Sequence, residues 1–394
     1  MSTAEFDTLD RTLAASGPAE ALDHLARTLA DRGDFRALLD ALLLRARHDL
    51  GLPMIQAGSL ADIPEPERTR YEERYVEAIR DVGSRLLGAG EIAAAWAYFR
   101  AIAEKEPVAR AIEAFVPTEG DDRLGQVVEV AFNQGAHPRR GFDLILDHYG
   151  TCSAISAFDA LPPDEATRVH AADRLVRRLH DDLVANLRAE IARRGQPSPR
   201  EGTPVAGLVE GRDWMFADDA YHLDVSHLAS TVRLAPLLAD PSTIALAVDL
   251  TEYGRRLSDR HRYEGDPPFE DHYGDHAAYL RALLGQDVDA AIARFRAKLP
   301  APDPDPDPDG RDEAVAAQVL VRLLARIGRT EEAVEVAAAH LARHPESTLG
   351  CPSVAQLCQS LGRPDRLAAI SRANGDLVHY AAARLEQRAA GPAS

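Results

Sequence analysis

The most constraining feature of this chain is where its proline and glycine residues lie. They stand between segments whose apolar residues recur every three or four positions, which is the pattern of amphipathic helices bounded by turns. We find no series of alternating, β-branched runs bounded by hairpin turns, as an antiparallel sheet would require. Aromatic residues make up only 6% of the chain, while Ala, Leu and Arg recur throughout, which also favours helices. The sequence therefore predicts an all-α fold.

The predicted helices come in pairs. Residues 19 to 49 are expected to form two helices with a break at residues 31 to 34, and residues 66 to 106 two more with a break at residues 88 to 90. A single long helix is expected over residues 164 to 194. Short breaks between consecutive helices favour antiparallel neighbours, so the implied unit is a helix hairpin.

Two segments share one spacing of small residues. In the first segment, the positions expected to line the two helices, the turn between them and the end of the pair are Ile79, Val82, Gly83, Leu86, Gly90, Ala95, Phe99 and Pro107. In the second segment, the matching positions are Ala317, Leu320, Val321, Leu324, Gly328, Ala333, Ala337 and Pro345. The spacing from glycine to alanine to proline is identical in both. This pattern resembles the tetratricopeptide repeat, in which small residues let two helices pack closely.

Both segments also depart from that repeat. The large aromatic residue of its first helix is missing, Val321 stands where a close-contact glycine is usual, and a late small position holds Ile102 or His340. The clear resemblance covers roughly 30 to 70 residues, clearest at 76–107 and 314–345. It implies an antiparallel helix-pair array, an α-solenoid, in which a concave face binds a protein or peptide.

Four segments are expected along the chain. They are N-terminal helical repeats (1–118), a central His/Asp-rich helical block (119–300), a linker (301–310) and C-terminal tetratricopeptide-like helices (311–394). The linker prediction rests on strictly alternating proline and aspartate, which favours an extended polyproline-like spacer. The central block has no clear repeat pattern, so a specialised function is expected to reside there.

The net charge of −18 argues against nucleic acid or an anionic membrane surface as the main partner, because both require a basic face. No run approaches the ~18 uninterrupted apolar residues of a membrane span. The opening residues lack the features of a secretory signal, and the three cysteines lack paired spacing. We therefore expect a cytoplasmic protein that binds a peptide or protein on an acidic concave face.

Histidine is the residue type that points to chemistry, since nine of fourteen histidines lie between His137 and His276. A helix over residues 217 to 236 would bury one stripe, made of Tyr221, Val225, Leu228 and Val232. It would place Asp219 with His222 on one flank and Asp224 with His227 on the other. A carboxylate three residues before an imidazole can orient that ring for base catalysis or metal binding. These four residues are the candidate catalytic residues.

A second pair, His272 and His276, has the spacing of helical zinc ligands, although Tyr273 stands where a catalytic glutamate would be expected. The candidate metal ligands, for a divalent cation such as zinc, are His222, His227, His272, His276 and Asp224. Trp214, Tyr273 and Arg233 are candidate ligand-binding residues. No glycine-rich phosphate loop is present, so no nucleotide cofactor is expected.

Three functions follow from these patterns. The favoured function is an interaction scaffold, because aspartate and histidine pairs also serve as hydrogen bonds between packed helices. The second is a metal-dependent hydrolase with its site in the central block. The third is a small-molecule sensor that uses the same residues without catalysis.

Overall fold

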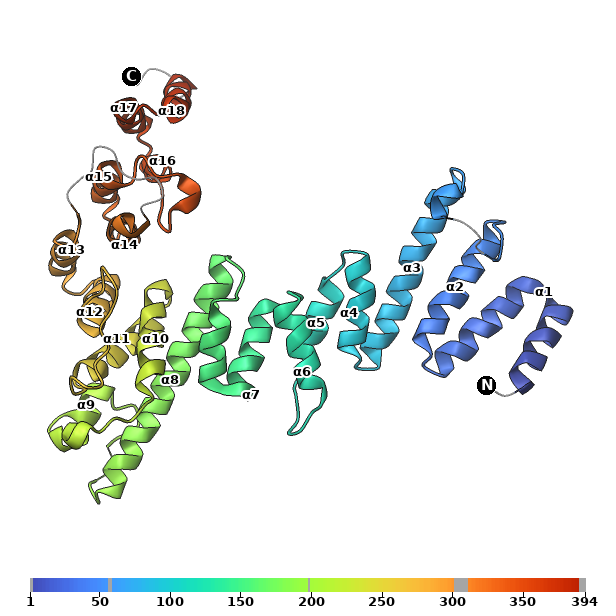
Figure 1. Ribbon diagram of the computed structural model, residues 1–394, viewed down its shortest axis with the longest axis horizontal. Helices are drawn as coiled ribbons and strands as arrows, with labels where there is room; N and C mark the ends of the chain where they lie inside the picture. Colours follow the sequence, from blue (N-terminus) through green and yellow to red (C-terminus); the bar gives the residue numbers. More distant parts are fainter. Residues whose placement is uncertain (1–2, 56–58, 198, 301–310, 390–394) are drawn as a thin grey trace. The chain divides into compact units, whose positions relative to one another are not determined.

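The computed structural model describes residues 3–55, 59–197, 199–300 and 311–389 (Figure 1). Within these ranges every regular element is a helix and no strand occurs, so the all-α prediction is confirmed. The Pro/Asp tract at 301–310 lies outside the described residues. None of the helices in these ranges combines the length and apolar character needed to cross a membrane. Contacts divide the chain into two compact units, Met1–Tyr149 and Gly150–Ser394.

The first unit consists of helices that pack against their neighbours along the chain. Its elements are α1 (Thr3–Asp31), α2 (Phe35–Asp49), η1 (Leu60–Asp62), α3 (Glu67–Gly88), α4 (Ile92–Ala101), α5 (Glu106–Ala114), α6 (Arg123–Val128), η2 (Glu129–Asn133) and the start of α7 (Pro138–Phe158). The predicted breaks at residues 31 to 34 and 88 to 90 are confirmed. Gly33 and Gly90 turn the chain there with positive φ angles of 70° and 81°, which glycine reaches at little steric cost.

The hairpin of α3 and α4 is the first of the two segments with the shared spacing. All the residues predicted to line its two helices are buried: Ile79, Val82, Gly83, Leu86, Ala95 and Phe99. A Cβ atom on Gly83 would lie 2.7 Å from Cε2 of Phe99, so a glycine is needed for this approach. The prediction that Pro107 ends the pair is wrong. α4 already ends at Ala101, and Pro107 lies in the first turn of α5, where its missing N–H costs little.

The second unit begins with the end of α7, where Gly150 interrupts the helix. Its further elements are α8 (Glu165–Arg193), α9 (Val205–Val209), η3 (Asp213–Asp219), α10 (Val225–Leu234), η4 (Ala235–Leu237), α11 (Pro241–Arg255), α12 (His272–Leu283), α13 (Val288–Arg296), α14 (Arg311–Arg326), α15 (Thr330–His340), η5 (Glu346–Thr348), α16 (Val354–Ser360), α17 (Pro364–Asn374) and α18 (Leu377–Ala389). α8 confirms the long helix predicted over residues 164 to 194. Helices α8, α10, α11 and α12 pack together and position the predicted site residues.

The hairpin of α14 and α15 is the second segment with the shared spacing. Its predicted inner residues are fully buried: Ala317, Leu320, Val321, Leu324, Ala333 and Ala337. Val321 takes the position of Gly83, and Ala337 takes that of Phe99. Each hairpin therefore has one small and one larger residue at these two positions. Pro345 does not end α15, which stops at His340, but precedes the short helix η5.

The helix predicted over residues 217 to 236 is wrong. The 3-10 segment η3 ends at Asp219, and α10 begins only at Val225. The physical reason is the side chain of Asp224, whose Oδ1 accepts the main-chain N–H groups of Ser226 and His227 at 2.9 and 3.1 Å. Such a cap satisfies the donors of a new helix start, and competes with a continuous helix. Tyr221, which was expected in the buried stripe, is consequently 53% exposed.

Candidate functional site

Six of the predicted site residues line two separate hollows of the second unit. The α8 hollow, about 560 Å³, is bounded by one side of α8 and by the chain from Tyr221 to His227. The central hollow, about 410 Å³, lies between α10, the segment 263–269, α12 and α14. His222, Asp224 and His227 line the first hollow, whereas Arg233, His272 and His276 line the second. The structure thus divides the predicted site in two.

His222 is held in place in the α8 hollow by its own hydrogen bonds. Its main-chain N–H donates to Oη of Tyr253 at 2.7 Å, and its ring Nδ1 lies 3.1 Å from the same oxygen. Its carbonyl oxygen accepts from Nδ2 of Asn186 at 2.8 Å. Burial lowers the pKa of His222 and raises that of Tyr253 to about 12, so both groups are neutral near pH 7. These contacts fasten the loop to α8 and α11.

The predicted aspartate and histidine pairs are not formed between side chains. Asp224 accepts a hydrogen bond from the main-chain N–H of His227, not from its ring. The hydrogen bond from the Ser226 hydroxyl, at 2.6 Å, and the one from this N–H lower the pKa of Asp224. Asp219 pairs with Arg260 at 3.2 Å and does not line the α8 hollow. His227 is half-buried at the hollow. The local contacts of these aspartates therefore serve helix capping and loop anchoring.

His272 and His276 do share one face of α12, as their spacing predicts, and their ring centroids are 4.8 Å apart. Nε2 of His272 lies 3.1 Å from the carbonyl oxygen of Ala229, and Nδ1 of His276 lies 2.6 Å from that of His272. Burial lowers the pKa of both rings, that of His276 to about 3. In the part of the chain that the structure describes, no group of three or more His, Cys, Asp or Glu residues could hold a metal ion.

The three candidate ligand-binding residues have different surroundings. The guanidinium carbon of Arg194, directly after α8, lies 4.8 Å from the ring centroid of Trp214 in η3, a cation-π contact. Tyr273 is 1% exposed, and its ring packs where a Cβ on Gly254 would lie, 2.4 Å from Cδ1. Tyr273 is thus a core residue of the α11 and α12 contact. Arg233 is exposed and lines the central hollow.

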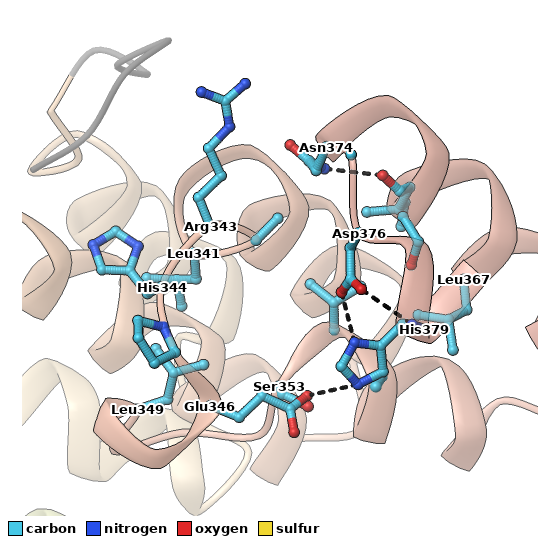
Figure 2. Close-up of a pocket in the computed structure, with 17 residues that line it drawn as sticks. Leu341, Arg343, His344, Glu346, Leu349, Ser353, Leu367, Asn374, Asp376 and His379 are labelled. Carbon is cyan, nitrogen blue, oxygen red and sulfur yellow. Dashed lines mark hydrogen bonds and ion pairs between the residues drawn. The ribbon is translucent and has the colours of Figure 1, made fainter. Parts of the chain in front are cut away.

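A further hollow, in the C-terminal helices, is absent from the sequence-based predictions (Figure 2). This C-terminal hollow has a volume of about 420 Å³ and is lined by residues of the segment 341–355 and of α17, α18 and the turn between them. Its apolar lining residues include Leu341, Leu349, Val354, Leu367 and Ile370. Its polar lining residues include Arg343, His344, Glu346, Asn374, Asp376 and His379.

Two acidic side chains of the C-terminal hollow contact the ring of His379. Its Nδ1 lies 2.6 Å from Oδ2 of Asp376, and its Nε2 lies 3.6 Å from Oε1 of Glu346 (Figure 2). Asp376 also accepts the main-chain N–H of Val378 and of His379, both at 3.1 Å, and so begins α18. This is an aspartate three residues before an imidazole that it orients. The same spacing occurs at Asp219 and Asp224, and it identifies this pair as well.

Comparison with known proteins gives no identification. No protein-family model matches the chain, and neither a curated protein nor a solved structure matches it. The helix-pair packing is compatible with a helical repeat fold.

Proposed function

We propose that this chain is a tetratricopeptide-like interaction protein and that its C-terminal hollow binds an extended peptide segment of a partner protein. The observation that supports the proposal best is the mixed lining of that hollow. Leu367 and Ile370 are half-buried, so part of their apolar surface is available in the hollow, whereas Leu341 is buried. The charged residues Arg343 and Glu346, by contrast, are exposed.

An extended peptide suits such a lining because its side chains point alternately to opposite sides. Apolar side chains on one side can be buried against Leu367 and Ile370, while peptide amides and charged groups reach Asn374 and His379. The imidazole of His379 is already oriented by Asp376, so little conformational freedom is lost when it binds. A volume of about 420 Å³ lies in the usual range for binding pockets.

The charge of the chain favours basic partners. A net charge of −18 attracts positively charged proteins over long range and raises their association rates. Glu346 and Asp376 bring acidic groups to the C-terminal hollow, while Arg343 has the opposite charge. We therefore expect the peptide to carry basic residues beside its apolar ones, in agreement with the acidic binding face expected from the sequence.

The hydrolase alternative has less support. A catalytic zinc site has three protein ligands and an open position. The candidate histidines lie in two hollows, and the described residues contain no group of three such ligands. The aspartates expected to assist catalysis cap α10 or pair with Arg260. The interaction function requires none of these residues to converge.

The experiment is a selection of random phage-displayed peptides on the full-length chain, followed by fluorescence polarisation with the selected peptides. The variant Ala355→Trp places a large side chain into the C-terminal hollow. Ala373→Trp adds the same side chain at an exposed position of α17 outside the hollow, as a matched control. We expect Ala355→Trp to weaken binding at least about tenfold and Ala373→Trp to leave it unchanged.

Circular dichroism of both variants should give the wild-type helical spectrum, which checks that the substitutions leave the fold intact. Failure to select any peptide contradicts the proposed function. Selected peptides that bind Ala355→Trp as tightly as the wild type contradict the proposed location.

A further inference from the structure

We propose that the central hollow binds a small zwitterion with a planar ring, of the chemical class of the aromatic amino acids. Its carboxylate would contact Arg233, and its ammonium group would contact Asp266. This site is separate from the C-terminal hollow, and the inference does not depend on peptide binding there.

The first observation is a pair of opposite charges without partners. Arg233, on α10, and Asp266, in the segment before α12, are both exposed and line the same hollow. Neither side chain forms an ion pair or hydrogen bond with another described residue, and they are not paired with each other. The main-chain oxygen of Asp266 accepts the N–H of Phe269 at 2.7 Å, which holds its position. A zwitterion would satisfy both charges at once.

The second observation is two buried imidazoles, each with a free acceptor nitrogen. His272 and His276 are 4% and 2% exposed and line the hollow. A ring nitrogen beside a carbonyl oxygen must carry the proton, so Nε2 of His272 and Nδ1 of His276 are the donors. Nδ1 of His272 and Nε2 of His276 are then acceptors, and no described residue donates to them. An ammonium group is the kind of donor that these nitrogens lack.

Burial lowers the pKa of both imidazoles, which keeps them neutral and able to accept hydrogen bonds near pH 7. A metal ion is the competing ligand for two such nitrogens. A metal ion in this hollow would have only the two histidines as protein ligands, because no group of three or more His, Cys, Asp or Glu residues that could hold a metal occurs among the described residues. The unpaired arginine at the same hollow also disfavours a cation and favours a ligand with a carboxylate.

The third observation is aromatic surface. Tyr263 is 54% exposed, and its ring contacts His272 edge-on with centroids 5.2 Å apart. Phe269 stacks on His276 at 4.1 Å. Aromatic rings bind other planar rings in stacked or edge-on geometry. A volume of about 410 Å³ accommodates one aromatic amino acid with some water.

The test is calorimetric titration of the full-length chain with L-tryptophan and L-phenylalanine. The analogues 3-phenylpropionate and phenethylamine each lack one of the two charged groups. We expect saturable binding of at least one of the two amino acids. If phenylalanine binds, each of these analogues should bind at least about tenfold more weakly than phenylalanine. If only tryptophan binds, the corresponding indole analogues should bind at least about tenfold more weakly than tryptophan. Arg233→Gln should weaken the amino acid and the carboxylate analogue but not the amine. Asp266→Asn should weaken the amino acid and the amine but not the carboxylate analogue.

Both substituted residues are exposed, so the core is left intact. Arg372→Gln removes the same charge from an exposed position of α17 outside the hollow and should leave binding unchanged. Absence of saturable binding of both amino acids up to about 1 mM would overturn the proposal. So would a carboxylate analogue that binds as tightly as its amino acid, or amino acid binding that neither Arg233→Gln nor Asp266→Asn weakens.

Discussion

The ring of Phe99 occupies the space that a Cβ atom on Gly83 would need, 2.7 Å from that position. At the equivalent positions of the second hairpin, Val321 and Ala337 replace this pair, and both are fully buried. The small residue is thus on the first helix in one hairpin and on the second helix in the other. Two helices can approach closely in either arrangement, provided that the combined volume is conserved.

Exchanging the sizes within the first hairpin tests this pairing. Gly83→Val should destabilise the first unit by about 1 to 3 kcal/mol through overpacking, and Phe99→Ala by about 3 to 5 kcal/mol through a cavity. The double variant, which reproduces the Val and Ala of the second hairpin, should cost at least about 1 kcal/mol less than the sum. Urea unfolding followed by circular dichroism measures all three. Strictly additive losses would show that the residues do not compensate each other.

Asp275 should be essential for the stability of the second unit. It is fully buried, and its carboxylate contacts Nε of Arg294 at 2.5 Å and Nζ of Lys298 at 2.6 Å. Asp275→Asn removes the buried carboxylate that both cations share, while Arg294 keeps Asp271 and Lys298 keeps Glu270 as a more exposed counter-charge. We therefore expect a loss of about 1.5 to 3 kcal/mol in the free energy of unfolding. Asp289→Asn removes an exposed partner of Arg329 and should cost less than about 1 kcal/mol. Equal losses in the two variants would contradict the role of burial.

His276 should make the second unit sensitive to acid. Burial lowers its pKa to about 3 from an ordinary 6.5, so the folded state stays unprotonated where the unfolded state binds a proton. Its contribution is therefore constant above pH 6.5 and is lost as the pH falls from there towards 3. Between pH 7 and pH 5 this single group should remove about 2 kcal/mol from the free energy of unfolding.

The matching variant is His276→Asn, which keeps a donor for the carbonyl oxygen of His272 but cannot titrate. Denaturant midpoints at several pH values should show a shallower pH dependence for this variant than for the wild type, whatever its stability at pH 7. Parallel pH profiles for the two proteins would show that His276 is not the group responsible.

Zinc should not be retained in stoichiometric amounts. His272 and His276 each use one ring nitrogen for a main-chain carbonyl, and no third ligand accompanies them in the described part of the chain. The measurement is metal analysis of the full-length chain after incubation with zinc and gel filtration, beside the double variant His272→Ala, His276→Ala. One zinc per wild-type chain, lost in the double variant, would instead support the hydrolase function.

The helices could be predicted because their signals are local. Gly33, Gly90 and Gly328 adopt the positive φ angles expected of turns between paired helices. The helix predicted over residues 217 to 236 does not form, and the cause is local too. Apolar periodicity continued across Tyr221, but the capping aspartate Asp224 outweighed it. An aspartate directly before an apolar residue, as Asp224 is before Val225, is a helix-start signal that outweighs apolar periodicity here.

The candidate site could be predicted only in part because it depends on contacts between distant helices. His272 is oriented by the carbonyl of Ala229, and His222 by Asn186 and Tyr253, contacts that no local pattern encodes. Which histidines share a hollow is therefore decided by helix packing. The pair of Asp376 and His379 is local, and its spacing alone predicts it, although it lies in the C-terminal helices and not in the central block.

The most direct test of peptide binding by the C-terminal hollow is hydrogen–deuterium exchange of the full-length chain with and without a selected peptide. Bound peptide should slow amide exchange in residues 341–346 and 374–379, which line the hollow. This protection should disappear in Ala355→Trp and persist in Ala373→Trp. Unchanged exchange in both segments, with protection found elsewhere or nowhere, would contradict the proposal that this hollow is the peptide-binding site.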